Sequence, residues 1–358
     1  MNGRSKVDVL VIGLGPAGAS AAAEAAKAGA RVAAIERKKC AGVPVQCAEF
    51  VPGPLAADVP GFARAARQAI TAMVTLAAED SAQETPDYRG QMIDRAVFDQ
   101  GLVEAAKAAG AGMCLGTAAT SLDADGVRLA NGGTIRAAVI IGADGPHSLA
   151  GKVIGAVNRE IVETRQITVP LLRAHQATDI FLSLDYRGGY GWLFPKGSLA
   201  HIGLGVSPER RQALKELLAA LHQRLVAEGR VGHEVRGLTG GAIPVGGLLP
   251  AASKLGETHV LLAGDAAGLT NPVTGAGIAS AVQSGRMVGQ AAAAICKGNA
   301  LAAATYTQDL EDLFGPSLAR ALHRRNELLQ KSAPTAADLK CGWIASPDYW
   351  LPYERPSP

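Results

Sequence analysis

The N-terminal stretch KVDVLVIGLGPAGASAAAEAAKAGARVAAIER contains the feature that most limits the folds open to this chain. An apolar run at residues 7–12 leads into a glycine-rich turn, an alanine-rich segment that ends at Gly29, and a second apolar run that ends on Glu36. The glycines of the turn follow GxGxxG spacing and are Gly13, Gly15 and Gly18. This order predicts a strand, a turn, a helix and a second strand, which is the dinucleotide-binding unit of Rossmann-type α/β domains.

Each part of this pattern has a physical task. Gly13 permits a tight turn, Gly15 lets the backbone approach a pyrophosphate, and Gly18 lets helix and strand pack closely. The helix N-terminus offers unpaired N–H groups and its positive dipole end to the anion. Glu36 can accept hydrogen bonds from ribose hydroxyls and would repel a 2′-phosphate, which favours FAD or NAD over NADP. The cofactor-binding residues expected here are Gly13, Gly15, Pro16, Ala17, Gly18, Glu36 and Arg37.

Composition and cysteine spacing exclude several other classes of protein. The 358 residues suffice for two domains or one large interleaved unit. With 35 basic against 32 acidic residues, the charge is too balanced to indicate a nucleic-acid partner. No apolar run reaches the roughly 18 residues of a membrane-spanning helix, so we expect a cytoplasmic protein with at most peripheral membrane contact. The 5 cysteines are scattered and odd in number, and predict neither a disulfide framework nor a metal site.

Three later segments resemble fingerprints of the glutathione-reductase-like FAD fold, in the branch of p-hydroxybenzoate hydroxylase. They are MIDRAVFDQGLVEAAKAAGA at 92–111, VIIGADGPHS at 139–148 and HVLLAGDAAGLTNPVTGAGIASAVQSG at 259–285. The resemblance implies that Asp265 bonds the ribitol chain of FAD and that Arg95 lies near the cofactor cleft. A helix that starts at TGAG would offer N–H donors to the flavin ring. The further cofactor-binding residues implied are Gln46, Arg95, Asp144, Gly145, Asp265, Gly275, Ala276, Gly277 and Ile278. Asp94 is expected either as a helix N-cap or as a site residue.

Between these fingerprints, residues 179–206 alternate apolar and polar residues and predict antiparallel sheet. Within this stretch YGWLFPKG resembles the YxWxFPK signature of the geranylgeranyl reductase family, and GVPVQCAEF at 42–50 and GGAIPVGG at 240–247 resemble two of its loops. Members of that family use reduced FAD to reduce isolated carbon–carbon double bonds in prenyl chains. The resemblance implies a substrate pocket lined by Tyr190, Trp192, Phe194, Pro195 and Lys196, with Lys196 able to meet a phosphate at its mouth.

The same resemblance implies that Cys47 lies beside the reactive edge of the flavin as a catalytic residue. An isolated alkene needs a hydride on one carbon and a proton on the other. Cys47 could hold the alkene or donate the proton, with Glu49 and a water molecule as rivals. Considered without the family, a small buried hydrophobe is the favoured interpretation of Cys47, and core packing is the favoured interpretation of the three aromatic residues. Ala48 stands where the family usually has glycine, which affects the expected shape of this loop.

The predicted architecture is a glutathione-reductase-like FAD-binding domain of Rossmann type, interleaved with an antiparallel-sheet substrate domain. We expect the FAD-binding part at 1–157 and 255–332, the substrate part at 158–254 with a contribution from 60–90, and a C-terminal tail at 333–358. The tail could cover the pocket or meet a second subunit. The predicted function is FAD-dependent reduction of carbon–carbon double bonds in an isoprenoid or similar apolar substrate. The alternatives are a flavin monooxygenase or halogenase of the same fold and a non-catalytic FAD-binding partner. The expected reductant is NAD(P)H or a ferredoxin-like donor protein.

Overall fold

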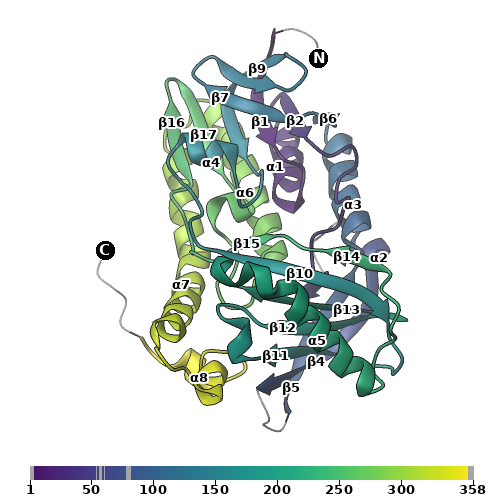
Figure 1. Ribbon diagram of the computed structural model, residues 1–358. Coiled ribbons are helices and arrows are strands. Elements are labelled where there is room, and N and C mark those ends of the chain that lie inside the picture. Colours follow the sequence, from purple (N-terminus) through teal and green to yellow (C-terminus); the bar gives the residue numbers. More distant parts are fainter. Residues whose placement is uncertain (1–3, 54, 56–58, 60, 78–81, 354–358) are drawn as a thin grey trace.

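Two β-sheets organise the chain, and a long helix, α7 (Ala302–Gln330), runs along one side of the molecule from the first sheet toward the second (Figure 1). The computed structural model describes residues 4–53, 55, 59, 61–77 and 82–353. The other positions of the predicted domains, among them 1–3, 60, 78–81 and 354–358, lie outside the described residues. The α/β fold class with two sheet-based parts is confirmed.

The first sheet contains the predicted dinucleotide-binding unit. Its strands follow the order β16-β17-β9-β1-β2-β6, and all pairs from β17 to β6 are parallel. The strands on this path are β1 (Arg4–Ile12), β2 (Val32–Glu36), β6 (Gly112–Leu115), β9 (Thr134–Gly142), β16 (Ala252–Leu255) and β17 (Thr258–Leu262). The hairpin strands β7 (Ala119–Asp123) and β8 (Gly126–Leu129) extend the sheet from β9. Strands β1, β9 and β17 are buried in the main hydrophobic core, as central parallel strands must be.

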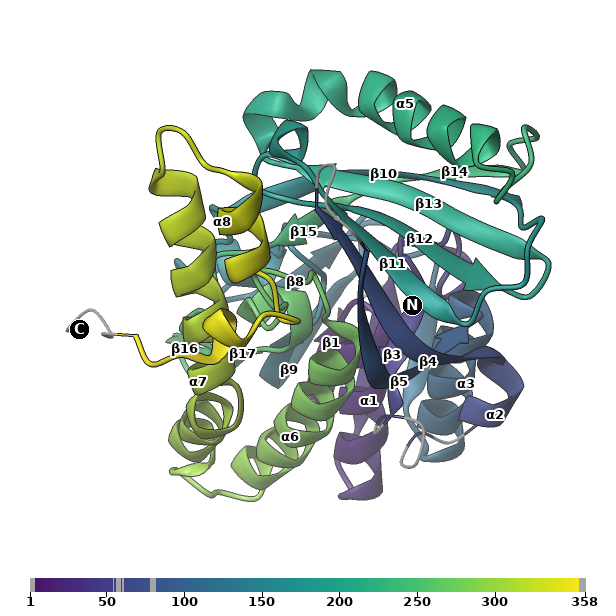
Figure 2. The ribbon, with the colours of Figure 1, turned by 90° about the horizontal axis from the view of Figure 1, so that it is seen from below.

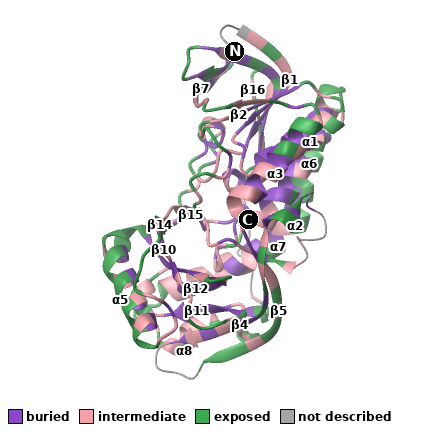
Figure 3. Ribbon diagram, turned by 90° about the vertical axis from the view of Figure 1, so that its right-hand side faces the viewer, coloured by how far each residue is buried: buried purple, intermediate pink, exposed green. Residues whose placement is uncertain are grey.

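Three helices pack side by side beside this sheet, with their buried faces inward (Figure 3). They are α1 (Pro16–Lys27), α3 (Arg95–Ala108) and α6 (Ile278–Cys296). The contact between α1 and α6 requires glycine, because a Cβ at Gly285 would lie 2.2 Å from the carbonyl oxygen of Ala17. Gly285 therefore packs on the first turn of α1. A short helix, α4 (Leu149–Val153), contacts β7 and β9.

The second sheet carries the segment that was predicted to be antiparallel. Its order is β14-β10-β13-β12-β11-β4-β5-β3, with β15 also paired to β10. The strands are β3 (Phe50–Pro52), β4 (Ala66–Ala77), β5 (Gln83–Ile93), β10 (Ile161–Pro170), β11 (Ala177–Leu182), β12 (Gly191–Lys196), β13 (Leu199–Val206), β14 (Gly237–Thr239) and β15 (Ala242–Pro244). Strands β11, β12 and β13 are antiparallel as expected, whereas β11 pairs with β4 in parallel, so the sheet is mixed. Strands β3 to β5 join this sheet although they come from residues 50–93.

The two faces of the second sheet have different neighbours. Helix α5 (Leu214–Ala227) lies along one face and packs on Leu193, Ile202 and Leu204 (Figure 2). Trp192 and Phe194 point to the opposite face, because side chains alternate along β12. The remaining helices are α2 (Phe62–Ala65), α7 (Ala302–Gln330) and α8 (Ala336–Cys341), and short 3-10 helices lie at Leu184–Tyr186, Pro208–Ala213, Gly264–Ala267 and Pro347–Trp350. Within the described segments, none of the helices has the combination of length and apolar character that crossing a bilayer requires.

Candidate functional site

Two adjoining cavities contain most of the predicted site residues. The first, of about 410 Å³, is lined by the glycine-rich turn and is called here the glycine-turn cavity. The second, of about 340 Å³, is lined by β12 and by residues 46–49, called here the Cys47 loop, and is called the aromatic cavity. Both are lined by Gly15, Gln46, Arg95, Ala143, Gly145 and Asp265. Because the two cavities share these lining residues, they lie side by side, and one extended ligand could occupy both.

The glycines of the GxGxxG turn shape the wall of the glycine-turn cavity. A Cβ at Gly13, whose φ is +93°, would lie 2.3 Å from the carbonyl oxygen of Ala143. A Cβ at Gly18 would lie 1.9 Å from the carbonyl oxygen of Gly13, so Gly18 supports the turn from behind and does not line either cavity. A Cβ at Gly15 would meet no atom within 4 Å. The backbone at Gly15 is therefore open to a ligand at the start of α1, where Pro16 and Ala17 line the aromatic cavity.

The far end of the glycine-turn cavity carries a fixed carboxylate. Glu36 ends β2, and its two carboxylate oxygens accept hydrogen bonds from the backbone N–H groups of Leu14 at 2.9 Å and Lys38 at 2.8 Å. This geometry holds Glu36 where a ribose can meet it, and Arg37 lines the same cavity. Asp144 also lines the cavity, but its carboxylate accepts hydrogen bonds from Ser148 and Leu149 at the start of α4. Burial raises the pKa of Asp144 against these hydrogen bonds.

Asp265 lines both cavities, and the N-terminus of α6 lines the aromatic cavity. The Asp265 carboxylate accepts a hydrogen bond from Oγ1 of Thr270 at 2.8 Å. Burial raises the pKa of Asp265, while Thr270 and Arg95 act in the opposite direction. Helix α6 starts at Ile278, and no side chain caps its N-terminus at Gly277. The free N–H groups therefore remain available to a ligand in the aromatic cavity, which is lined by Gly275, Ala276, Gly277 and Ile278.

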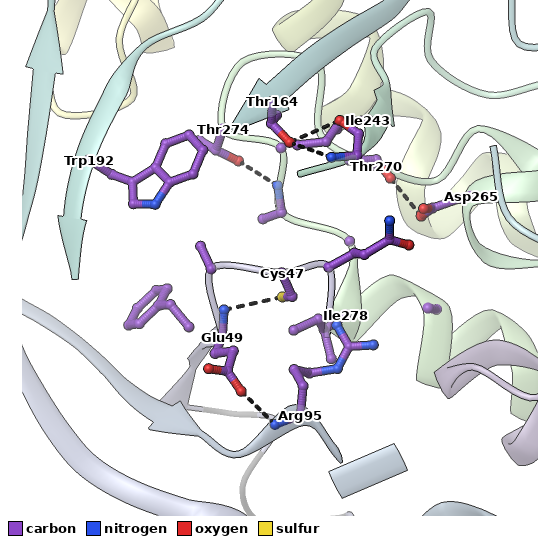
Figure 4. Close-up of a pocket in the computed structure, with 18 of the residues that line it drawn as sticks. Cys47, Glu49, Arg95, Thr164, Trp192, Ile243, Asp265, Thr270, Thr274 and Ile278 are labelled. Atoms are coloured by element: carbon purple, nitrogen blue, oxygen red, sulfur yellow. Dashed lines mark hydrogen bonds between the residues drawn. The ribbon is translucent and has the colours of Figure 1, made fainter. Parts of the chain in front are cut away.

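The Cys47 loop faces this helix N-terminus across the aromatic cavity (Figure 4). Sγ of Cys47 accepts a hydrogen bond from the backbone N–H of Glu49 at 3.1 Å. The carbonyl oxygen of Cys47 accepts from Nε2 of Gln166, and Oε1 of Gln166 accepts from Nε1 of Trp192, at 3.1 and 3.0 Å. Gln166 thus links the Cys47 loop to strand β12. The loop is also held by Gln46, which donates to the carbonyl oxygen of Gly240 at 3.0 Å.

Glu49 anchors the same loop from below. One carboxylate oxygen accepts from the backbone N–H of Arg95 at 2.8 Å, and the other accepts from Nζ of Lys196 and Nε2 of His201, at 2.6 Å each. Burial works against ionisation of Glu49, but His201, the Arg95 amide and Lys196 outweigh it and lower its pKa to about 2. Glu49 adopts φ of 66° and is the left-handed residue of the loop, whereas Ala48 is not. An alanine at position 48 therefore needs no strained backbone.

Lys196 and Pro195 do not line either of the two cavities. The ammonium group of Lys196 pairs with the buried carboxylate of Glu49, and Pro195 is a buried residue of β12. Arg95, in contrast, lines both cavities. It forms two hydrogen bonds of 3.0 Å with the carboxylate of Asp99, while Asp94 is the N-cap of α3 and accepts from the Val97 N–H. Burial disfavours the charge of Arg95, but Asp99 and Cys47 outweigh burial and raise its pKa.

Aromatic rings enclose the second cavity. Tyr190, Trp192 and Phe194 all line it, and the Tyr190 hydroxyl donates to the carbonyl oxygen of Thr274 at 2.5 Å. Trp343 from the C-terminal tail packs on Tyr190 with ring centroids 4.9 Å apart and lines the cavity too. Further apolar lining comes from Phe50, Met73, Tyr88, Ile180 and Ile243. The arrangement can bury an apolar chain and exclude water from it.

Sequence reasoning missed several residues of this site. His201 is the one polar side chain of β13, LAHIGLGV, and this was the available signal for it, whereas Gln166 lies among other polar residues of β10, IVETRQITVP, and gave no such signal. Tyr88 on β5 gave no signal, because only the pairing of β4 and β5 into the second sheet brings it to the cavity. Among the described residues, no group of three or more histidine, cysteine or acidic side chains could hold a metal ion.

Comparisons with known proteins identify the class. Residues 8–154 match the sequence profile of the family described as FAD dependent oxidoreductase. The chain is 32% identical over 349 residues to the digeranylgeranylglycerophospholipid reductase of Methanocella arvoryzae, a match that covers 88% of this chain and 85% of the relative. The enzyme of the same name from Methanosarcina mazei is 33% identical over 320 residues, which covers 81% of this chain and 75% of the relative.

Solved structures agree with these matches. A geranylgeranyl bacteriochlorophyll reductase-like protein from Thermoplasma acidophilum has a TM-score of 0.84 and 25% identity, covering 96% of this chain and 92% of that one. A probable FAD-dependent monooxygenase from Pseudomonas aeruginosa shares the fold with a TM-score of 0.70 and 18% identity, covering 94% and 98% of the two chains. The protein is an FAD-dependent oxidoreductase. More narrowly, it belongs to the geranylgeranyl reductase family.

Proposed function

We propose that this chain reduces carbon–carbon double bonds in an isoprenoid chain of the geranylgeranyl type. The observation that carries the proposal is the meeting of the Cys47 loop, the aromatic strand β12 and the N-terminus of α6 in one apolar cavity. The names of the relatives support the substrate class, since the matched archaeal enzymes are digeranylgeranylglycerophospholipid reductases.

We further propose which residues hold FAD. Gly15 and the start of α1 would receive the pyrophosphate, Glu36 the ribose, and Asp265 the ribitol chain. The open space at Gly15, the fixed carboxylate of Glu36 and the uncapped N-terminus of α6 fit this placement. Bound and reduced, FAD supplies the hydride that one alkene carbon receives. The first sheet with its helices would then form the FAD-binding part, and the second sheet the substrate part.

The protein must supply the proton that the second alkene carbon receives. Glu49 holds no proton at neutral pH, because its pKa is lowered to about 2, so it is not a suitable donor. The thiol of Cys47 is the group we assign to this step. The negative charge left on the sulfur would be met by the Glu49 N–H and by the guanidinium of Arg95. A proton from solvent then restores the thiol.

Tyr190, Trp192 and Phe194 would hold the chain and keep water from it, with Trp343 packed on Tyr190 at one side of the cavity. The electron donor that reduces FAD is proposed to be NAD(P)H bound transiently or a ferredoxin-like protein. Because an isoprenoid lipid partitions into bilayers, we propose that the enzyme meets its substrate by peripheral contact with a membrane.

An anaerobic experiment tests the proposed function. FAD-loaded protein is reduced with dithionite and mixed with geranylgeranyl diphosphate or digeranylgeranylglyceryl phosphate. We expect reoxidation of the flavin without oxygen and a product heavier by two hydrogens for each bond reduced. If reoxidation occurs only after oxygen is admitted and gives a hydroxylated product, the chain is a monooxygenase and the proposal is wrong.

A further inference from the structure

A third cavity, of about 80 Å³, adjoins the aromatic cavity and shares Tyr190 and Trp343 with it. Here it is called the arginine cavity, because Arg187, Arg324 and Arg325 line it together with apolar residues of α7 and α8 such as Leu328. A smaller void of about 30 Å³ is lined by both Trp192 and Arg325. The arginine cavity therefore lies next to the aromatic cavity, and Tyr190 lines both of them as well as the small void.

Among the residues that the structure describes, two of these arginines have no carboxylate partner. Arg324 pairs with Glu327 at 2.8 Å, so its charge is balanced. The side chain of Arg187 donates to the carbonyl oxygen of Leu329, at 2.9 Å, and the side chain of Arg325 donates to that of Gly188, at 2.5 Å. Across the part of the chain that the structure describes, neither Arg187 nor Arg325 forms an ion pair.

The charge of Arg325 is poorly compensated where it lies. Its Nε is buried and has no hydrogen-bond partner. Burial lowers the pKa of Arg325, and the more distant Glu160 and Glu209 offset this only in part. An anionic ligand would balance the charge of a half-buried arginine that has no counter-ion. A phosphate suits this role, since a guanidinium forms paired hydrogen bonds to phosphate oxygens. Arg187 is exposed beside it, so the site opens to solvent.

We propose that Arg187 and Arg325 bind the phosphate ester at the head of the isoprenoid substrate, while its chain enters the aromatic cavity past Tyr190 and Trp343. The inference rests on the proposed function and names the head group that this function did not specify. It replaces Lys196 in that task, because the ammonium of Lys196 is already paired with Glu49. The shared chemistry is a phosphate ester, carried either by a prenyl diphosphate or by an isoprenoid glycerophosphate.

The test compares each phosphate ester with the alcohol that has the same chain. Geranylgeranyl diphosphate is paired with geranylgeraniol, and digeranylgeranylglyceryl phosphate with digeranylgeranylglycerol. Binding to FAD-loaded protein is measured by titration calorimetry, and turnover by anaerobic flavin reoxidation. The variants are Arg187→Gln, Arg325→Gln and Arg325→Lys, and Arg236→Gln is the control because it removes a surface arginine that lines none of these cavities.

We expect the wild-type protein to bind at least one phosphate ester tenfold or more tightly than its alcohol, and the tighter ester identifies the source. Arg325→Gln should abolish this preference and raise KM for the ester about tenfold with kcat unchanged. Arg325→Lys should restore part of it, and Arg236→Gln should match wild type. Equal binding of ester and alcohol, no binding of either, or a preference that survives both glutamine variants overturns the inference. A preference for the ester without any reduction would leave the anion site standing and sink the proposed function instead.

Discussion

The carboxylate of Glu49 and the imidazole of His201 share a 2.6 Å hydrogen bond between two buried side chains. The bond joins the Cys47 loop to β13 of the second sheet, and Lys196 of β12 reaches the same oxygen. Glu49 also accepts from the first backbone N–H of α3. One carboxylate therefore fixes the thiol loop to both structural parts of the enzyme.

Glu49→Gln is expected to lower the free energy of unfolding by about 3 kcal/mol, because it breaks the ion pair between the buried carboxylate of Glu49 and the half-buried ammonium of Lys196 and leaves that ammonium without its counter-charge. Urea unfolding of the FAD-loaded protein measures this. Asp125→Asn is the control, since its exposed ion pair with Arg136 is worth at most about 1 kcal/mol. An equal effect in both variants would show that Glu49 is not the anchor described here.

The pH dependence of the free energy of unfolding should show the ionisation of Glu49. The pKa of Glu49 is 4.5 in the unfolded chain and about 2 in the folded protein, so its ionised form stabilises the fold fully above about pH 4.5. This contribution is lost as the pH falls from about 4.5 to about 2. The urea midpoint of wild type should therefore drop more steeply in that window than that of Glu49→Gln. Parallel curves for the two proteins would contradict the assignment.

Cys47→Ala is expected to keep FAD and lower the anaerobic rate of alkene reduction by about 10²-fold or more, the usual size of a lost acid. Cys47→Ser should retain only a small part of the rate, because a hydroxyl is a weaker acid than a thiol. Single-turnover flavin reoxidation measures both. Cys114→Ala is the matched control, because Cys114 lies on β6 and lines neither the glycine-turn nor the aromatic cavity. Full activity in Cys47→Ala would reduce this residue to packing.

Asp265→Ala should purify without the yellow colour of FAD. The substitution removes the carboxylate that lines both cavities and leaves Oγ1 of Thr270 without its acceptor. The ratio of flavin to protein absorbance gives the result, and the exposed Asp125→Ala provides the comparison. A fully loaded Asp265→Ala protein would move the cofactor away from this wall.

Gln166→Leu should slow reduction without loss of FAD, because Gln166 links the carbonyl oxygen of Cys47 to Nε1 of Trp192. The buried Trp192 N–H left without an acceptor should cost about 1–3 kcal/mol of stability. A double-mutant cycle with Trp192→Phe measures the coupling, since Gln166→Leu should then cost less. Strict additivity of the two substitutions would mean that the link carries no energy.

The sequence predicted the local units well and the long-range contacts poorly. The GxGxxG turn, the Asp94 cap and strands β12 and β13 follow from short-range rules of backbone geometry and side-chain alternation. The partner of Lys196 does not, because the pairing of Lys196 with Glu49 spans 147 positions and depends on how two sheets meet. Lys196 was therefore assigned to a phosphate from its place after the aromatic residues, whereas it lies against a carboxylate.

Gly285 gives a second example of the same limit. A run of small residues in a helix indicates a close neighbour, but the sequence does not say whether that neighbour is a ligand or another helix. The structure gives α1 as the neighbour, with Ala17 against Gly285 and Ala21 against Gly289. Trp343 is similar, since its aromatic character suggested burial but only the path of α7 and α8 brings it to Tyr190.

The backbone contact between α1 and α6 has a mechanical consequence. The first turn of α1 borders the glycine-rich turn, and the start of α6 borders the aromatic cavity. The two helix ends that would hold the cofactor therefore belong to a pair of helices in direct backbone contact. A methyl group at position 285 would push α1 and α6 apart, and with them the two helix ends, because its carbon would lie 2.2 Å from the carbonyl oxygen of Ala17. The distance between the two helix ends thus depends on position 285 carrying only a hydrogen atom, and not on a side chain that touches the ligand.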